Sequence, residues 1–257
     1  LSRQNVMQYK KDRISQSDEV NAEQEATRLM KELEASLGMD RMPMHIECFD
    51  NSNISGTNAV AACVVFRKCK PSKKEYRTYN IKSVTGPDDY ASMKEVVRRR
   101  YHRLREEGAA LPDLIITDGG KGQMEVVREV VEDELGLCIP IAGLAKDDRH
   151  RTSELLFGFP AKTIGMKPNS ALFHLLTQIQ DEVHRFAIKF HRDKRSKAQV
   201  ASELDNVPGI GPKTKEALLR KLHSIKRIRE ADREEIESII GKSKAEAIYN
   251  HFHKTIQ

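Results

Sequence analysis

Tryptophan is absent from the 257 residues, and aromatic residues make up only 5% of the chain. No apolar run approaches the ~18 residues that mark a membrane-spanning helix. The four cysteines form no CxxC pair, which argues against a structural zinc site and against a disulfide scaffold. The composition also excludes collagen and low-complexity disorder. We therefore expect a cytoplasmic protein without a membrane segment, whose thiols are reduced and buried.

Charge, in contrast, is plentiful and unevenly placed. Charged residues make up 32% of the chain, and the formal net charge is +6. Residues 1–180 carry +1 of this total, whereas residues 181–257 carry +5. A basic region on a chain of this kind suggests a polyanionic partner, most simply nucleic acid. A solvated helix face is the alternative that charge alone leaves open.

The length suits about two domains, one with a substantial core and a small module beside it. Because the chain begins with Leu1 rather than Met, we expect a fragment of a longer protein. Residues 1–40 resemble a linker and a lead-in helix. Runs of β-forming residues predict strands over 44–49, 59–66, 74–81, 112–118, 139–145, 154–159 and 163–166. Apolar spacing predicts helices over 21–37, 88–107, 123–135 and 170–197. A meander followed by β-helix-β units predicts a mixed sheet flanked by helices.

The last 55 residues or so contain a weak internal repeat. Residues 204–209 (LDNVPG) align with residues 236–241 (IESIIG) at an offset of 32. Each segment leads into a helical stretch that carries lysine. Two such units bury little surface alone, so we expect them to pack on each other.

Two of the predicted strands end on an acid, Asp50 and Asp118. If the strands are neighbours, the carboxylates meet at one edge of the sheet and can share a divalent cation. Mg²⁺ and Mn²⁺ prefer oxygen ligands, and a cation held there can activate water and neutralise phosphodiester charge. The alternative is that each aspartate caps a turn or a helix.

His184 lies on the predicted long helix, within the segment Asp181-Glu182-Val183-His184-Arg185. Its imidazole could bind a metal or accept a proton. A lone histidine on a helix is more often structural, and this interpretation also stays open.

Two glycine-rich turns could hold a phosphate at a helix N-terminus. The first, Gly119-Gly120-Lys121-Gly122, is not a P-loop because no Ser or Thr follows the lysine. The second, Pro208-Gly209-Ile210-Gly211-Pro212, lets a phosphate approach the backbone closely, and Lys213 and Lys215 follow it. Such a contact predicts binding without sequence preference. An ordinary tight turn between helices is the alternative.

These motifs together resemble the UvrC family, the incision subunit of bacterial nucleotide excision repair. The resemblance rests on the segments IECFD (46–50), VAACVVF (60–66), DDY (88–90), ITDGGKGQ (116–123) and DEVHRFA (181–187), in this order. It extends over about residues 40–257. It implies a ribonuclease-H-like endonuclease domain over 41–197 and a tandem helix-hairpin-helix domain over 198–257.

The family implies a metal-dependent cut 5′ to a DNA lesion. The catalytic residues that carry over are Asp50, Asp89, Asp118 and His184, and the ligands of Mg²⁺ or Mn²⁺ are Asp50, Asp118 and His184. The residues expected to bind DNA are Lys121, Arg192, Lys194, Arg195, Gly209, Gly211, Lys213, Thr214, Lys215, Gly241, Lys242, Ser243 and Lys244. The second hairpin lacks the Gly-x-Gly form of the first, so we expect it to hold phosphate more weakly.

Damaged double-stranded DNA is the implied substrate, and the protein UvrB is an implied partner whose main binding segment lies outside this sequence. We expect this fragment to be monomeric. Two other functions remain open at this point: a DNA-binding module without catalysis, and a junction-cutting nuclease of another family.

Overall fold

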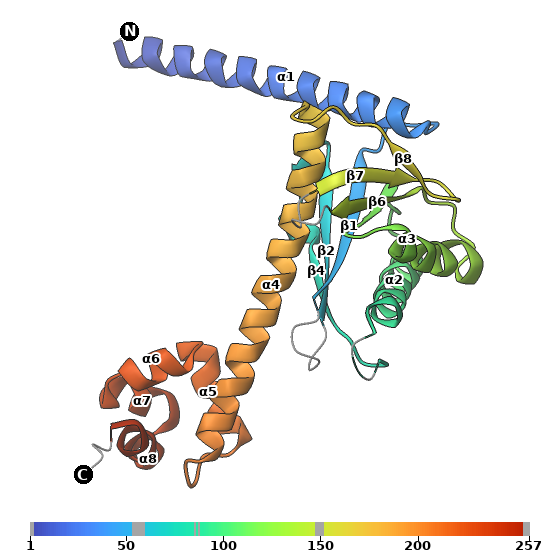
Figure 1. Ribbon diagram of the computed structural model, residues 1–257. Helices are drawn as coiled ribbons and strands as arrows, with labels where there is room; N and C mark the ends of the chain where they lie inside the picture. Colours follow the sequence, from blue (N-terminus) through green and yellow to red (C-terminus); the bar gives the residue numbers. More distant parts are fainter. Residues whose placement is uncertain (1–2, 53–59, 85, 87, 147–151, 254–257) are drawn as a thin grey trace. The chain divides into compact units, whose positions relative to one another are not determined.

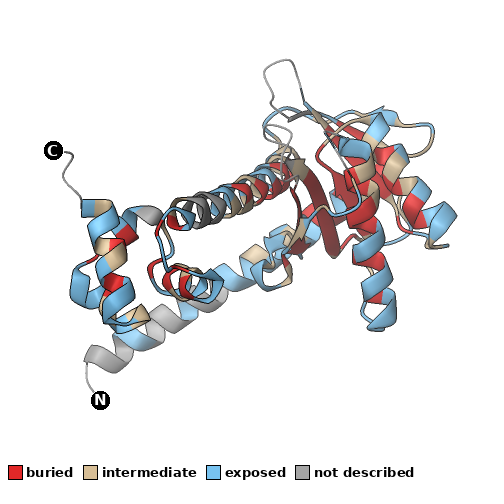
Figure 2. Cartoon of the chain, turned by 90° about the horizontal axis from the view of Figure 1, so that it is seen from below, coloured by how far each residue is buried: buried red, intermediate tan, exposed pale blue. Residues whose placement is uncertain are grey.

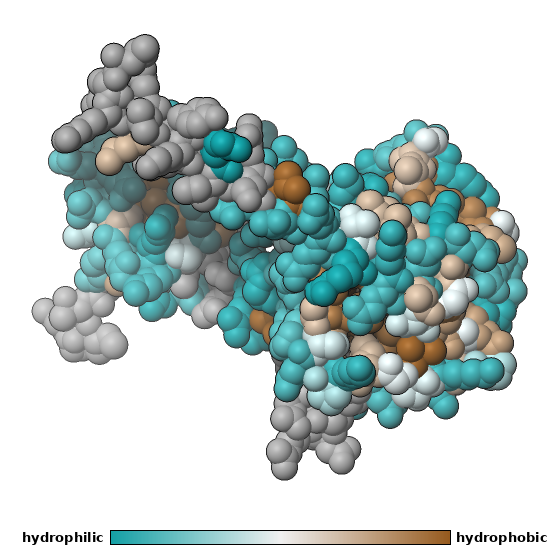
Figure 3. Space-filling view, turned by 90° about the horizontal axis from the view of Figure 1, so that it is seen from above, coloured by the Kyte–Doolittle hydropathy of each residue, from teal (hydrophilic) through white to brown (hydrophobic). Residues whose placement is uncertain are grey.

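The computed structural model describes residues 3–52, 60–84, 86, 88–146 and 152–253. The chain divides into two compact units, Leu1–Ile188 and Lys189–Gln257. Among the described residues, no helix combines the length and the apolar character that crossing a membrane requires. The surface seen in Figure 3 is mainly hydrophilic, and its hydrophobic areas are small and separate.

The first element, α1, extends over Arg3–Leu37 and begins well before the helix expected over 21–37. The segment contains no glycine or proline, so nothing in it breaks a helix once the helix has formed. In its last third, Leu29, Met30, Leu33 and Leu37 are buried. The expectation that the first ~20 residues form a linker therefore has to be corrected to a helix.

The larger unit is built on one mixed sheet of eight strands (Figure 1). The strands are β1 (His45–Ser52), β2 (Val60–Arg67), β3 (Lys70–Pro71), β4 (Arg77–Asn80), β5 (Leu114–Thr117), β6 (Ile141–Lys146), β7 (Thr152–Phe157) and β8 (Lys162–Ile164). Their order is β3-β2-β1-β5-β6-β7-β8, with β4 also paired to β2. The central strands β1, β5 and β6 are parallel, and the outer pairs are antiparallel. This confirms the predicted mixed sheet.

Two expected elements differ from the sequence prediction. In place of a strand over 74–81, Lys73–Glu75 form a 3₁₀ turn and only Arg77–Asn80 pair with β2. The Ser72 hydroxyl donates to Glu75 at 2.7 Å, which favours the turn. In place of one helix over 123–135, α3 spans Lys121–Arg128 and continues as a π-helical turn, Glu129–Glu134.

Helices cover both faces of the sheet, so each face has its own core. One core lies between the sheet and the helices α1 and α4, and the second between the sheet and the helices α2 and α3. Here α2 is Asp89–Glu106 and α4 is Ala171–Asp205. Figure 2 shows the buried residues on the strands and on the inward sides of these helices. Along a strand, successive side chains therefore alternate between the two cores.

The smaller unit contains the end of α4 and the helices α5 (Pro212–Leu222), α6 (Ile225–Glu230), α7 (Arg233–Ile240) and α8 (Lys242–His253). The repeat seen in the sequence has a structural counterpart. Gly209 and Gly241, its aligned glycines, have φ angles of +81° and +84°, which glycine adopts without strain. The aligned residues Leu204 and Ile236 are both fully buried in the core of this unit.

All four cysteines are free. Cys48 and Cys63 are buried in β1 and β2, as expected of residues in apolar runs. Cys69 is half-buried and Cys138 is exposed, so the expectation of buried thiols is wrong for Cys138. Cys138 lies in the connection that precedes β6.

Candidate functional site

Alternation along β1 decides which core each of its side chains faces. Ile46 and Cys48 belong to the core under α1 and α4, so Asp50, two residues further, faces the same side. Asp50 is paired with Ala62 of β2, which also belongs to this core. The side chain of Asp50 is only 9% exposed. A buried carboxylate thus lies at the point where the apolar part of β1 ends.

A second carboxylate follows β5, the parallel neighbour of β1. Thr117 lies opposite Phe49 in the register, and the N–H of Asp118 donates to the Phe49 carbonyl at 2.9 Å. Because parallel neighbours end at the same edge of the sheet, Asp118 lies beside Asp50. The side chain of Asp118 is 1% exposed.

Helix α4 adds an imidazole to the two carboxylates. Val183 and Ala187 pack into the core under α4, and His184 lies between them with its Nδ1 atom 3.1 Å from Asp50 Oδ2. In the described part of the chain, potential ligand atoms of Asp50, Asp118 and His184 lie within 4.8 Å of one another. The His184 side chain is 52% exposed, so the cluster is open to solvent on this side.

The environment of Asp50 and His184 shifts the pKa of both groups. Burial raises the pKa of Asp50, the hydrogen bond with His184 opposes this effect, and the charge of Asp118 adds to it. The hydrogen bond with Asp50 raises the pKa of His184 against the effect of partial burial. A neutral imidazole that donates from Nδ1 carries its lone pair on Nε2. That atom is therefore suited to bind a cation or accept a proton.

Two further residues contact Asp118, and the sequence analysis missed both. Lys146 ends β6, and its Nζ atom lies 2.9 Å from each carboxylate oxygen of Asp118. Gln180 lies on α4, one turn before His184, and its Nε2 atom donates to Asp118 Oδ1 at 2.6 Å. The strand-end rule that identified Asp118 applies equally to Lys146. For Gln180 the available signal was an amide on a helix face otherwise lined with apolar residues.

Asp89 is not part of the cluster. It is the first residue of α2 and is exposed. The Asn51 side chain, next to Asp50, donates to the backbone carbonyl of Asp89 at 2.7 Å. The Asp89 carboxylate is not in the group within 4.8 Å. A catalytic role for Asp89 therefore stays a prediction.

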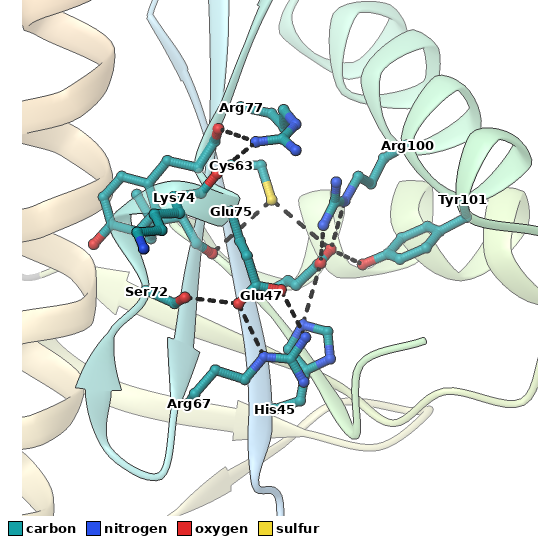
Figure 4. Close-up of polar contacts among 12 residues, drawn as sticks. His45, Glu47, Cys63, Arg67, Ser72, Lys74, Glu75, Arg77, Arg100 and Tyr101 are labelled. Carbon is teal, nitrogen blue, oxygen red and sulfur yellow. Dashed lines mark hydrogen bonds and ion pairs between the residues drawn. The ribbon is translucent and has the colours of Figure 1, made fainter. Parts of the chain in front are cut away.

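Another acid of β1, Glu47, faces the opposite core and belongs to a different network (Figure 4). Arg100 donates to its two carboxylate oxygens at 2.5 and 3.2 Å, and the Tyr101 hydroxyl donates at 3.1 Å. His45 Nε2 lies 3.3 Å from Glu47. Since Arg100 and Tyr101 already bind both carboxylate oxygens, we assign Glu47 to the stability of the sheet and not to the site.

The glycine-rich turn after Asp118 leads directly into α3. Gly120 is the N-cap of the helix, and Lys121 is exposed in its first turn. The turn passes close to β6, because a Cβ atom on Gly143 would lie 2.7 Å from the carbonyl oxygen of Gly119. Gly143 thus gives the turn space beside the carboxylate of Asp118. Phosphate binding at Lys121 stays a prediction.

In the smaller unit, the two predicted phosphate turns precede α5 and α8. Gly209 and Gly211 are exposed and Gly211 is the N-cap of α5, while Gly241 directly precedes α8. Lys213, Lys242 and Ser243 are exposed in the first turns of these helices. Exposed cations therefore lie at the starts of both helices, and phosphate binding at these turns stays a prediction.

Other predicted DNA-binding residues are placed differently. Thr214 is 8% exposed, and its hydroxyl accepts a hydrogen bond from Lys244 Nζ at 3.2 Å. Lys215 is largely buried and forms an ion pair with Asp205. At the basic stretch of α4, Arg192 and Arg195 are exposed, whereas Lys194 is half-buried, and burial lowers its pKa. The Thr214 hydroxyl and the Lys215 ammonium therefore already have partners within the unit, Lys244 and Asp205.

Comparison with protein families matches both units. Residues 34–188 match the model of the UvrC RNAse H endonuclease domain. Residues 201–254 match the model of the SAM-like Helix-hairpin-helix tandem.

Comparison with curated proteins finds relatives described as "UvrABC system protein C". The chain is 70% identical over 248 residues to the protein from Bacteroides thetaiotaomicron, covering 96% of this chain and 41% of that protein. It is 49% identical over 256 residues to the protein from Porphyromonas gingivalis, covering 99% and 42%. The chain therefore spans about two fifths of the length of these relatives.

Among solved structures, human ENDOV is 13% identical, with a TM-score of 0.39, over 70% of this chain and 99% of that chain. The Endonuclease V of Ciona intestinalis, in complex with a DNA that contains an inosine, is 16% identical, with a TM-score of 0.31, over 40% and 46%. Similarity this low bears on neither substrate nor mechanism.

Proposed function

Because the chain belongs to the UvrC family, we propose that it is the part of a nucleotide excision repair nuclease that hydrolyses a DNA phosphodiester with the aid of a divalent metal ion. The observation that supports this most directly is the meeting of Asp50, Asp118 and His184 within 4.8 Å. These residues come from three separate parts of the chain: β1, the turn after β5, and α4. We assign to this chain the cut on the 5′ side of the lesion, the activity that the family resemblance implies.

The donor set fits Mg²⁺ or Mn²⁺. Asp50 and Asp118 offer carboxylate oxygens, which both ions prefer, and the imidazole of His184 favours the softer Mn²⁺. A cation bound there would stabilise the ionised form of Asp50, which burial disfavours. Asp50, Asp118 and His184 would therefore hold the ion. When bound, it would polarise the scissile phosphate and lower the pKa of a water molecule.

The side chains of this site have separate tasks in the proposed hydrolysis. Asp50 orients His184 by accepting its Nδ1 proton, which leaves Nε2 to bind or to take up a proton. The ammonium of Lys146, next to Asp118, adds positive charge where the phosphodiester is expected to approach. Positive charge at this place stabilises the negative charge that develops on the phosphate oxygens.

The smaller unit would hold the DNA backbone. Exposed cations and backbone N–H groups at the starts of α5 and α8 suit phosphate contacts without sequence preference. Lys213 and Lys242 are the exposed lysines at these two turns. Damaged duplex DNA is the proposed substrate, UvrB the proposed partner of the whole protein, and the cytoplasm the proposed location.

The test is incision of a pre-nicked, lesion-bearing duplex in Mg²⁺ or Mn²⁺. Asp50→Ala and Asp118→Ala should abolish cutting and leave DNA binding unchanged. Asp181→Ala is the matched control, since Asp181 is an exposed acid one turn from His184 and lies outside the cluster. If both site variants still cut, or if Asp181→Ala abolishes cutting as well, the assignment is wrong.

A further inference from the structure

Gln180 is a buried polar side chain on an apolar helix face. Its neighbours along that face of α4 are Leu176, Ile179 and Val183, all in the core, and Gln180 itself is 2% exposed. Burying an amide costs free energy unless its groups find hydrogen-bond partners. A leucine at this position would pack without such a demand. The glutamine therefore needs an explanation in terms of what it contacts.

The Gln180 amide donates from Nε2 to two oxygen atoms. One acceptor is Asp118 Oδ1 at 2.6 Å, and the other is the backbone carbonyl of Leu144 at 3.1 Å. Two acceptors on the same atom identify it as the NH₂ group and not as the amide oxygen. The Leu144 carbonyl belongs to β6, so it anchors the amide to the sheet. The second hydrogen bond then fixes one carboxylate oxygen of Asp118.

A comparison with Lys146 shows why a neutral donor matters here. Lys146 and Gln180 both support the carboxylate of Asp118. A divalent cation bound to Asp118 repels the ammonium of Lys146 but not the amide of Gln180, which carries no net charge. The Gln180 contact can therefore persist unchanged when a cation binds. The Lys146 contact competes with the cation for the same oxygens.

We propose that Gln180 is a positioning residue that holds Asp118 in the orientation required for binding the metal ion. Gln180 and His184 are four residues apart on one face of α4, so this helix contacts both carboxylates, Asp118 through Gln180 and Asp50 through His184. The pairing of β1 and β5 brings the two carboxylates together, and α4 contacts the side chain of each. This inference rests on the proposed metal-dependent function.

Titration of Mn²⁺ into the 257-residue chain by calorimetry, without DNA, tests the inference. Gln180→Met keeps the length of the side chain and removes the donor. We expect the dissociation constant for Mn²⁺ to rise roughly 10- to 100-fold, as is typical when a partner of a metal ligand is lost. Lys146→Met removes the competing cation, so this variant should bind Mn²⁺ at least as tightly as the wild type. Gln178→Met is the matched control, because Gln178 is exposed on the same helix.

Two further measurements separate positioning from folding. For each variant, the unfolding midpoint is measured with and without Mn²⁺, and the difference is compared between variants. A variant that is merely less stable would not show a smaller difference. Cutting by Gln180→Met should require more Mn²⁺ for half-maximal rate and should recover at saturating Mn²⁺, which a misfolded site would not allow. If Gln180→Met does not fold, Gln180→Asn takes its place, because it keeps the donor but shortens its reach.

The outcomes are distinguishable. Wild-type affinity in Gln180→Met overturns the inference and leaves the proposed function intact. Equal weakening in Gln180→Met and Lys146→Met overturns the argument from charge. No binding of Mn²⁺ by the wild type contradicts the metal-dependent function itself.

Discussion

The ion pair of Glu47 and Arg100 permits a quantitative test of how this sheet is stabilised. Glu47 is fully buried, and the Arg100 side chain is 9% exposed. Burial opposes ionisation of Glu47, yet the neighbouring His45 and Arg100 outweigh it and hold the pKa of Glu47 below its ordinary value. Glu47→Gln removes the counter-charge and leaves a buried guanidinium without compensation. Breaking such a pair from one side costs about 3–5 kcal/mol.

The pair Arg67–Glu75 provides the control, because it has nearly the same geometry at the surface (Figure 4). Its two hydrogen bonds are 2.7 and 3.1 Å long, and its side chains are 43% and 35% exposed. Water solvates the partner that remains, so Glu75→Gln should cost at most about 1 kcal/mol. Burial is therefore the main difference between the two substitutions.

Urea unfolding at pH 7, followed by far-UV circular dichroism, measures both variants. Both pairs lie in the larger unit, so the same transition reports on both. In thermal unfolding, a loss of 1 kcal/mol lowers the midpoint by roughly 2–4 °C in a domain of this size. The double variant Glu47→Leu/Arg100→Leu should recover much of the loss, because no unpaired charge remains. The reasoning is refuted if Glu47→Gln costs no more than Glu75→Gln.

Two further predictions concern the turn and the pH. Gly143→Ala should destabilise the larger unit by about 1–3 kcal/mol and weaken Mn²⁺ binding, because its Cβ would meet the backbone of the Asp118 turn at 2.7 Å. Gly120→Ala has open space around its Cβ and should leave Mn²⁺ binding unchanged, so equal losses of Mn²⁺ affinity in the two variants would contradict the steric argument. The stability advantage of the wild type over Glu47→Gln should be full at pH 7. This advantage should shrink as the pH falls from the ordinary pKa of a glutamate toward the lower pKa that Glu47 has in the folded protein. A constant advantage from pH 7 to pH 3 would contradict the prediction.

Apolar runs predicted most of the strands closely. The ends of β2 were placed within one residue, and those of β1 and β5 within three. The extent of α1 was not predictable in the same way, because its amino-terminal half has no apolar periodicity. There only the absence of helix-breaking residues pointed to a helix, and that is a weak signal. A contact between Ser72 and Glu75 favours the 3₁₀ turn at Lys73–Glu75, and alternation along a strand does not reveal it.

The sequence identified the residues of the site but could not show that they lie close together in space. Asp50, Asp118 and His184 were candidates because of their types and their places at strand ends or on a helix. They lie together only because β1 is the neighbour of β5 and because α4 packs on the sheet with His184 toward Asp50. Both are features of the tertiary structure. Lys146 at a strand end and Gln180 on an apolar helix face carried signals, but these signals did not say which residue each contacts. Only the distances to Asp118 give them a role.

One strand, β1, carries two buried acids three residues apart, and they face opposite sides of the sheet. In a random screen for strains that lose DNA repair, changes at Glu47 and at Asp50 would be recovered together and would look alike. They differ in how much protein survives in the cell, since an Asp50 variant should accumulate normally whereas a Glu47 variant should be degraded. Protein abundance, measured together with repair, would therefore distinguish an acid with the proposed role in the reaction from one that stabilises its strand.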